Sequence, residues 1–304
     1  MKPSTILFLL LALFASATEA RAKTVVPLRV RGDKSLITIK IGNLMIPDIL
    51  LDTGFAFDGV IIYRPEYRDS LALTGASEVR IGGAGSEEAS SALMLDSMSF
   101  RVGDVDLTNQ RLIVLQNDTF KGFPSNGIVG YSIFGHYVTR FDYDRNTMTL
   151  NNAGEAKIDS TWTGVPLYFK QNNVPWVDVS VVIRKERPTA LSAYIDFAAS
   201  EPILILQKPG MKVGLPEQTA DAVLGKGLSG DVRGRTGRIS RLIIGPYQLN
   251  DVQAAFAPAE ARSKQESADA VIGSGLLRRF NLIFDYSGKR LYLKPNTQFG
   301  KPSS

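Results

Sequence analysis

Two aspartates in this 304-residue chain follow short apolar segments, where a carboxylate is held at the end of a strand. Asp52 comes after Ile49-Leu50-Leu51 and before Thr53-Gly54, and Asp196 comes after Ala193-Tyr194-Ile195. Two carboxylates that share a site cannot both ionise cheaply, so they share a proton. One can then take a proton from a bound water while the other protonates a substrate carbonyl, which suits amide hydrolysis. Two ordinary Asx turns would leave the same local pattern, and that pattern alone favours neither interpretation.

The residue types that are missing narrow the chemistry further. The chain has no cysteine, which excludes disulfides, thiol catalysis and thiolate metal sites. A catalytic Ser-His pair built on the single histidine, His136, would need a nucleophile elbow, and no Gly-x-Ser-x-Gly sequence is present. A zinc site with paired histidines is impossible as well. The sequence therefore predicts no metal and no cofactor, and carboxylates remain as the catalytic groups.

The formal net charge of +5 is spread over many short runs. The densest basic group lies between Arg233 and Arg241, and no aromatic residues alternate with its arginines. Nucleic-acid sites combine basic and aromatic side chains, so this group favours a solvated hairpin over a nucleic-acid site.

A segment of the first half of the chain returns in the second half. Residues 127–150 match residues 270–293 without a gap, at an offset of 273 − 130 = 143. Asp196 lies 196 − 52 = 144 residues after Asp52, at nearly the same spacing. The matched residues are Gly130 with Gly273, Phe141-Asp142-Tyr143 with Phe284-Asp285-Tyr286, and Leu150 with Leu293. The repeat predicts an internal duplication in which each copy carries one strand-end aspartate.

Strand patterns account for most of the chain from Thr24 onwards. Leu36–Ile41 alternates as a half-buried strand does, and Val60-Ile61-Ile62 is an apolar strand. The chain is too long for one small core, which favours two units of roughly 130 residues. We expect an all-β fold, mostly antiparallel with short helices. Its N-terminal lobe spans residues 24–152, a polar linker residues 153–164, and a C-terminal lobe residues 165–297.

Residues 1–20 have the composition of a signal peptide. Lys2 supplies the positive start and Ile6–Phe14 the apolar centre, and either Thr18-Glu19-Ala20 or Ala15-Ser16-Ala17 serves as a small-residue cleavage site. An uncleaved membrane anchor is the alternative, but no later segment approaches eighteen apolar residues. We therefore expect an exported protein, periplasmic or secreted, with no membrane span in the mature chain.

With these motifs the chain resembles the bilobal aspartic proteases of the pepsin/retropepsin-like superfamily, in a compact bacterial-type form. The resemblance covers about Val25 to Lys294. It rests on Asp52-Thr53-Gly54, Ile128-Val129-Gly130, Val271-Ile272-Gly273 and Asp196. It implies two homologous retropepsin-like β-barrel lobes that form a cleft, with Asp52 and Asp196 as the catalytic pair. It also implies that Thr53, Gly54, Gly130 and Gly273 support this pair, and that a β-hairpin flap, within residues 82–86 or 227–237, covers the cleft.

The second motif, Asp196-Phe197-Ala198, departs from the family pattern. In the family, two threonines hydrogen-bond across the lobe junction. Phe197 stands in place of the second threonine and has no hydroxyl for such a hydrogen bond with Thr53. Ala198 keeps a backbone N–H for the carboxylate, but it adds about 1 kcal/mol of strain if the turn requires a positive φ. Phe55 replaces the small residue that is usual after the glycine, which narrows the space near Asp52.

The leading hypothesis is an exported aspartic endopeptidase that acts as a monomer on extended polypeptides. Because of the Asp-Phe-Ala motif, a catalytically inactive homologue that binds peptides is the first alternative. A purely structural β module of the envelope is the second. The sequence indicates neither the substrate-binding residues nor the cleavage specificity.

Overall fold

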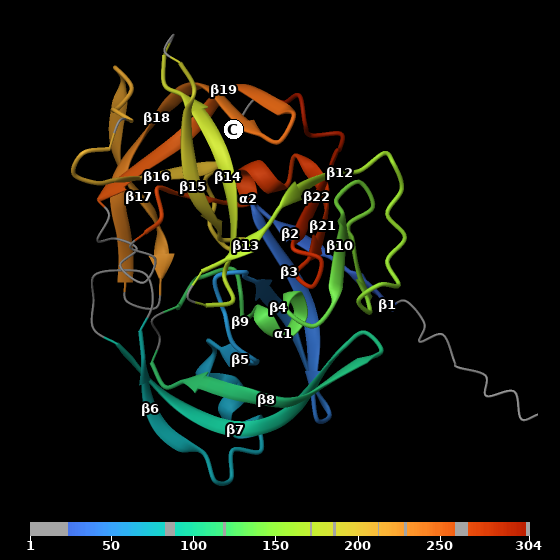
Figure 1. Ribbon diagram of the computed structural model, residues 1–304. Helices are drawn as coiled ribbons and strands as arrows, with labels where there is room; N and C mark the ends of the chain where they lie inside the picture. Colours follow the sequence, from blue (N-terminus) through green and yellow to red (C-terminus); the bar gives the residue numbers. More distant parts are fainter. Residues whose placement is uncertain are drawn as a thin grey trace, which may run out of the picture.

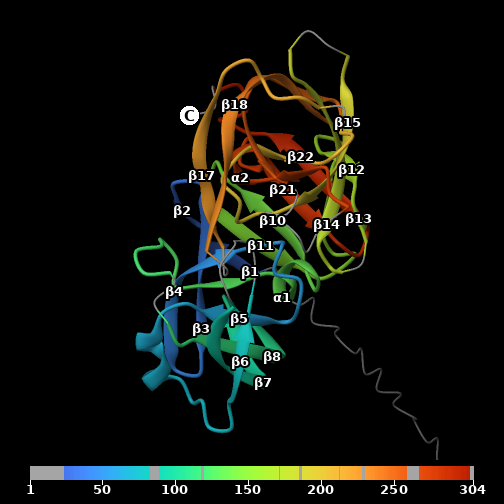
Figure 2. The ribbon, with the colours of Figure 1, turned by 90° about the vertical axis from the view of Figure 1, so that its left-hand side faces the viewer.

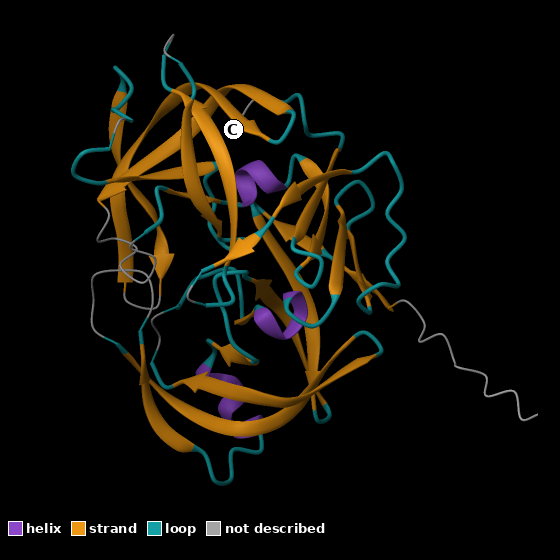
Figure 3. Cartoon of the chain, viewed as in Figure 1, coloured by secondary structure: helices purple, strands orange, loops and turns teal. Residues whose placement is uncertain are grey.

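The computed structural model describes residues 24–301 except 83–88, 118–119, 171, 185–186, 212, 228–229 and 259–266. The predicted signal peptide and most of the candidate flap at residues 82–86 lie outside the described residues. Strands dominate the described chain, with three short helices among them (Figures 1 and 3). The predicted all-β fold is confirmed. No helix in the described part of the chain is both long and apolar enough to cross a membrane.

The N-terminal lobe is built on one eight-stranded sheet. Its strands, in spatial order, are β2 (Arg29–Arg31), β3 (Lys34–Ile41), β4 (Leu44–Leu51), β9 (Gly127–Val129), β5 (Gly59–Ile62), β8 (Val105–Leu115), β7 (Ser90–Val102) and β6 (Ser77–Ile81). An additional pairing between β3 and β7 curls the sheet towards a barrel. The 3₁₀ helix η1 (Pro65–Ser70) follows β5, and the one-turn helix α1 (Tyr131–Phe134) follows β9.

The C-terminal lobe repeats this arrangement strand for strand. Its order is β13 (Tyr168–Phe169), β14 (Pro175–Val182), β15 (Thr189–Ile195), β20 (Ala270–Ile272), β16 (Ile203–Gln207), β19 (Tyr247–Pro258), β18 (Gly230–Ile244) and β17 (Thr219–Gly227). The extra pairing of β14 with β18 corresponds to that of β3 with β7, and the one-turn helix α2 (Ser274–Leu277) follows β20 as α1 follows β9. The duplication inferred from residues 127–150 therefore extends over both lobes.

A third sheet, of six strands, joins the two lobes (Figure 2). Its order is β1 (Thr24–Pro27), β11 (Thr147–Asn151), β10 (Val138–Asp142), β21 (Phe280–Asp285), β22 (Arg290–Pro295) and β12 (Thr163–Pro166). At its centre, Arg140 of β10 lies opposite Ile283 of β21. The two positions are 283 − 140 = 143 residues apart, which is the offset of the sequence repeat. The pseudo-twofold axis of the molecule therefore passes through this strand pair.

The segment between the lobes packs on the shared sheet. Trp162 is 8% exposed and lies in a cluster with Val138 and Ile283, next to the sheet's central strand pair. The guanidinium of Arg140 lies 4.8 Å from the centre of the indole. Thr163 and Gly164, which the sequence analysis placed in the linker, belong to β12 and pair with β22.

Aromatic side chains from both halves of the chain fill the centre of the main core. Phe134 and Phe141 come from the first half, and Phe197 and Phe284 come from the second; all four are fully buried. The centres of their rings lie 4.9–6.1 Å apart. Because each buried phenylalanine contributes about 1.5–3 kcal/mol, this cluster holds the two halves together.

We expect Phe141→Ala to lower the free energy of unfolding by about 3–5 kcal/mol, because the ring contacts residues of both halves. Since the lobes share a sheet and a core, calorimetry should show one transition that moves as a whole to lower temperature. Val25→Ala, at a 55% exposed position on the same sheet, is the control and should change stability by less than about 0.5 kcal/mol. Two separate transitions, of which only one moves, would contradict this expectation.

Candidate active site

The two aspartates lie at equivalent places in the two lobes. Asp52 directly follows β4, and its N–H donates to the carbonyl of Val129 in β9 at 2.9 Å. Asp196 directly follows β15, and its N–H donates to the carbonyl of Ile272 in β20 at 3.0 Å. Each aspartate loop is thus fixed by the strand that ends in two apolar residues before a glycine, β9 before Gly130 and β20 before Gly273.

The glycines that end these strands lie against the aspartate loops. A Cβ on Gly130 would overlap the carbonyl oxygens of Asp52 and Phe55, and a Cβ on Gly273 would overlap that of Glu201. Directly after each glycine, a backbone N–H donates to a carbonyl of the aspartate loop. On the N-terminal side, this hydrogen bond runs from the N–H of Tyr131 to the carbonyl of Phe55 at 2.8 Å. Both positions therefore require glycine because backbone approaches backbone, and not because of a positive φ.

Backbone N–H groups hold one oxygen of each carboxylate. Gly54 donates to Oδ1 of Asp52 at 2.6 Å, and Ala198 and Ala199 donate to Oδ1 of Asp196 at 3.1 and 3.0 Å. Neither Gly54 nor Ala198 has a positive φ, so alanine carries no backbone strain there. Gly54 is explained by close approach, since a Cβ on it would lie 3.0 Å from Asp52 Oδ1.

Thr53 links the two aspartate loops across the lobe junction. Its hydroxyl donates to the carbonyl of Ile195 at 2.7 Å and accepts from the N–H of Phe197 at 3.0 Å. These two groups belong to the residues on either side of Asp196. Thr53 is 2% exposed, so its hydrogen bonds are shielded from water. One threonine thereby sets the position of the second aspartate relative to the first.

The side chain of Phe197 makes no equivalent hydrogen bond to the loop of Asp52. Its side chain has no hydroxyl, and its ring is completely buried, 4.9 Å from the ring of Phe141 and 5.8 Å from that of Phe134. The C-terminal loop therefore contributes apolar packing where the N-terminal loop contributes hydrogen bonds. The junction has repacked around this ring.

The charges of both aspartates affect one buried tyrosine. Tyr63 follows β5 and is 4% exposed. Burial raises the pKa of its hydroxyl well above the usual range, and the negative charges of Asp52 and Asp196 raise it further. The sequence analysis missed Tyr63, whose only signal is its place directly after the apolar strand Val60-Ile61-Ile62.

Aromatic and basic neighbours fix the position of Tyr63. Its ring stacks on that of Phe120, with centres 4.1 Å apart, and Phe123 meets it edge-on. The guanidinium of Arg64 donates to the carbonyls of Phe120 and Phe123 at 3.0 and 2.6 Å. Arg64 thus holds the loop that covers Tyr63.

Apolar clusters lie on either side of the aspartates, and each receives a residue from the opposite lobe. Ala198 of the C-terminal loop packs against the N-terminal cluster that includes Leu50 and Ile128. Ala56 of the N-terminal loop packs against the C-terminal cluster that includes Trp176 and Tyr194. Among the described residues, no three His, Asp or Glu side chains come together as a metal site would require. The arrangement supplies two carboxylates, backbone N–H donors and apolar walls.

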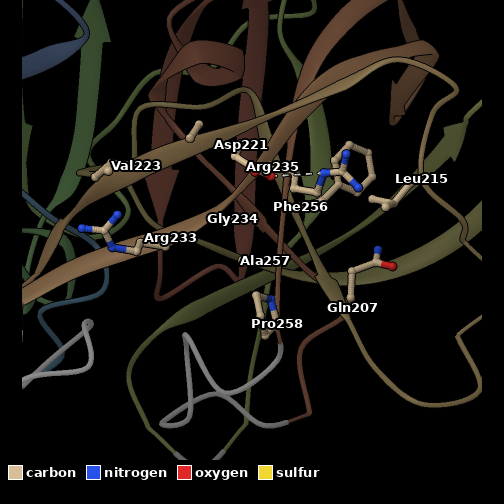
Figure 4. A pocket seen from close by; sticks show the side chains of 11 residues that line it. Gln207, Leu215, Asp221, Val223, Arg233, Gly234, Arg235, Phe256, Ala257 and Pro258 are labelled. Carbon is tan, nitrogen blue, oxygen red and sulfur yellow. Dashed lines mark ion pairs between the residues drawn. The ribbon is translucent and has the colours of Figure 1, made fainter.

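A cavity of about 740 Å³ lies in the C-terminal lobe (Figure 4). Its apolar wall includes Leu215, Phe256 and Pro258, and at one side Arg235 pairs with Asp221 at 3.5 Å. The described residues that line it include neither aspartate nor any residue of their loops. This cavity is therefore separate from the candidate site.

We expect Phe197→Thr, which would introduce a hydroxyl at the junction, to lower the free energy of unfolding by about 3 kcal/mol, because it empties the space that the buried ring fills. Ala198→Gly is the matched control in the same motif. It should change stability by less than about 1 kcal/mol, since the backbone there suits both residues. Denaturant unfolding measures both variants. An unchanged midpoint for Phe197→Thr would show that the junction is not packed around the ring.

No protein-family model and no curated protein sequence matches the chain. Among solved structures, the chain is similar to the aspartic proteinase from Irpex lacteus, with a TM-score of 0.59 and 13% sequence identity. The match covers 93% of this chain and 100% of that one. At this low identity the likeness concerns the fold, and the protein has the bilobal β fold of an aspartic proteinase.

Proposed function

We propose that the protein is an aspartic-type endopeptidase that hydrolyses peptide bonds with water activated between Asp52 and Asp196. The observation that carries the proposal is the lobe junction. There Thr53, the residue after Asp52, hydrogen-bonds to the residues on both sides of Asp196, so that the two aspartate loops are joined at one place. Structural Asx turns in two separate lobes would need no such link between them.

Each carboxylate has a distinct task in this mechanism. The pair shares one proton. The ionised carboxylate takes a proton from water as the water oxygen bonds to the carbonyl carbon, and the protonated carboxyl gives its proton to the carbonyl oxygen. When the tetrahedral intermediate collapses, the carbon–nitrogen bond breaks, the carboxyl that took the water proton gives it to the leaving amine, and the other carboxylate takes a hydroxyl proton from the intermediate. The backbone N–H groups that hold Oδ1 keep both carboxylates in place throughout.

We propose extended polypeptides as the substrate class. A segment that lies between two β lobes can add to them as a strand, with its side chains alternating between the two sides. Half-buried residues at the edges of the two apolar clusters, such as Phe57 and Ala199, would then contact apolar side chains of the segment. No cofactor or metal enters this chemistry.

A peptide-binding protein without catalysis is the second candidate. The observation in its favour is the one-sided junction, where Phe197 packs but makes no side-chain hydrogen bond to Thr53. A library of labelled peptides, tested at acidic and at neutral pH, separates the two candidates. Cleavage supports the peptidase, and binding without cleavage supports the second candidate.

The two aspartates should behave as a unit. Asp52→Asn and Asp196→Asn should each abolish cleavage to a similar degree, and the double variant should be little worse than either, because neither carboxylate works alone. Turnover of a labelled peptide measures the effect. Asp285→Asn is a matched control, since Asp285 Oδ1 also accepts a backbone N–H at a turn, from Gly288 at 2.8 Å. If Asp196→Asn keeps wild-type turnover while Asp52→Asn is inactive, the two-carboxylate mechanism is wrong.

We also propose that the protein is exported to the periplasm or the exterior, on the strength of the signal-peptide pattern in residues 1–20. The mature protein should begin near Thr18 or Arg21 and appear in a soluble periplasmic or extracellular fraction. Mass spectrometry of the fractions measures this. Recovery of the intact chain from Met1 in membranes would contradict it.

A further inference from the structure

A buried lysine of the N-terminal lobe contacts the loop of the second aspartate. Lys34, the first residue of β3, is 8% exposed. Its Nζ donates to the carbonyl of Ala198 at 2.6 Å and to the hydroxyl of Ser200 at 2.7 Å. It also lies 3.4 Å from Oδ2 of Asp33. Both hydrogen bonds cross from one lobe to the other.

The contacts of Lys34 account for its burial. A buried ammonium is unfavourable unless it is paired and hydrogen-bonded. Lys34 has three N–H donors, and three acceptors surround them: Ala198, Ser200 and Asp33. The ammonium is therefore fixed in place, and the group that it holds most closely is the carbonyl of Ala198.

The other lobe lacks an equivalent lysine. Leu36 pairs with Leu50 in the first lobe, and Trp176 pairs with Tyr194 in the second, so Leu36 and Trp176 are equivalent. Lys34 lies two residues before Leu36, and its counterpart two residues before Trp176 is Val174. Val174 is 1% exposed and apolar. On that side the neighbouring residue, Asn173, reaches across instead, and its amide donates to the carbonyl of Ala56 at 3.1 Å.

The difference between the two lobes at Lys34 falls on the same loop that carries the Asp196-Phe197-Ala198 motif. Ala56 and Ser200 are equivalent, because each is the fourth residue after its aspartate. The loop of Asp52 is held there by a neutral amide, whereas the loop of Asp196 is held by a buried ammonium. The charged contact lies on the loop in which Phe197 replaces a hydroxyl residue.

We propose that Lys34 is a positioning residue for Asp196. Ala198 donates its N–H to Asp196 Oδ1 and accepts the Lys34 ammonium at its carbonyl, so Lys34 fixes the orientation of the residue that orients the carboxylate. Together with Thr53, it holds the loop from the N-terminal lobe, in compensation for the contact that Phe197 cannot make. The proposal rests on the proposed peptidase function for its kinetic consequence, and on geometry alone for its effect on the loop.

The chain offers a matched control for this contact. Arg278 of the C-terminal lobe donates to the carbonyl of Gly32 at 2.5 Å. This hydrogen bond also crosses between the lobes, and neither its donor nor its acceptor belongs to the loop 196–200. Arg278→Met therefore removes a cross-lobe contact without removing the one under test.

Kinetics and hydrogen exchange of the full chain test the proposal. Lys34→Met should lower kcat about 10- to 100-fold with KM changed less than about threefold, because Lys34 acts on the geometry of a reacting group and not on substrate binding. Lys34→Arg, which keeps a cationic donor, should recover most of kcat. Amide exchange in the segment 196–200 should become about tenfold faster or more in Lys34→Met, since a charge-assisted hydrogen bond is lost. Arg278→Met should leave both kcat and this exchange unchanged.

The exchange measurement separates the failure of the two proposals. If the wild type shows no turnover, the peptidase proposal fails, and faster exchange in Lys34→Met still supports positioning by Lys34. If Lys34→Met keeps wild-type exchange in 196–200, or keeps wild-type kcat in an active enzyme, positioning by Lys34 is overturned. Should Lys34→Met not fold, Ser200→Ala removes one of its acceptors and undergoes the same two measurements. A smaller loss of kcat with faster exchange supports the proposal, and wild-type values of both overturn it.

Discussion

The antiparallel pairing of β10 with β21 sets the relation between the two lobes and, through it, the relation between the two aspartates. Arg140 and Ile283 face each other on the pseudo-twofold axis of the duplication. From this pair the chain runs back through a one-turn helix to Gly130 on one side and to Gly273 on the other. Each glycine lies directly against the backbone of an aspartate loop. Because these connections are short, fixing two strands at the axis brings two loops from distant parts of the sequence to one junction.

Within this symmetric frame the two loops are held by unequal means. Thr53 gives the N-terminal loop two hydrogen bonds to its partner, and Phe197 gives the C-terminal loop a place in the aromatic core. Lys34 adds a charged contact to the second loop only. Asp196 is 7% exposed and accepts two backbone N–H groups at one oxygen, whereas the half-buried Asp52 accepts one from Gly54. The duplication thus supplied two similar carboxylates, and later divergence gave them different surroundings.

Local signals were sufficient for much of the fold. The apolar runs that end at Leu51 and Ile195 are strands that lead into the aspartates, and the glycines at 130 and 273 lie where the backbones meet. These features follow from period, composition and chain order, which do not depend on distant residues. The predicted linker, residues 153–164, includes Thr163 and Gly164, which the structure places in β12. Their strand character comes from pairing with β22, more than 120 residues later, and no local pattern encodes that pairing.

The sequence by itself determined the all-β class, the duplication and the two strand-end aspartates, because apolar periodicity and an ungapped repeat can be recognised without a structure. Only the tertiary structure decided how the loops are held. The role of Thr53 depends on an acceptor 142 residues away, the carbonyl of Ile195, and on a donor 144 residues away, the N–H of Phe197. The sequence also did not decide what Phe197 does in place of a hydroxyl residue. Its ring could have disturbed the junction or filled a core there, and only the packing shows which. Lys34 resembles any surface lysine until the second lobe buries it, because burial and hydrogen bonding across a junction are properties of the assembled chain.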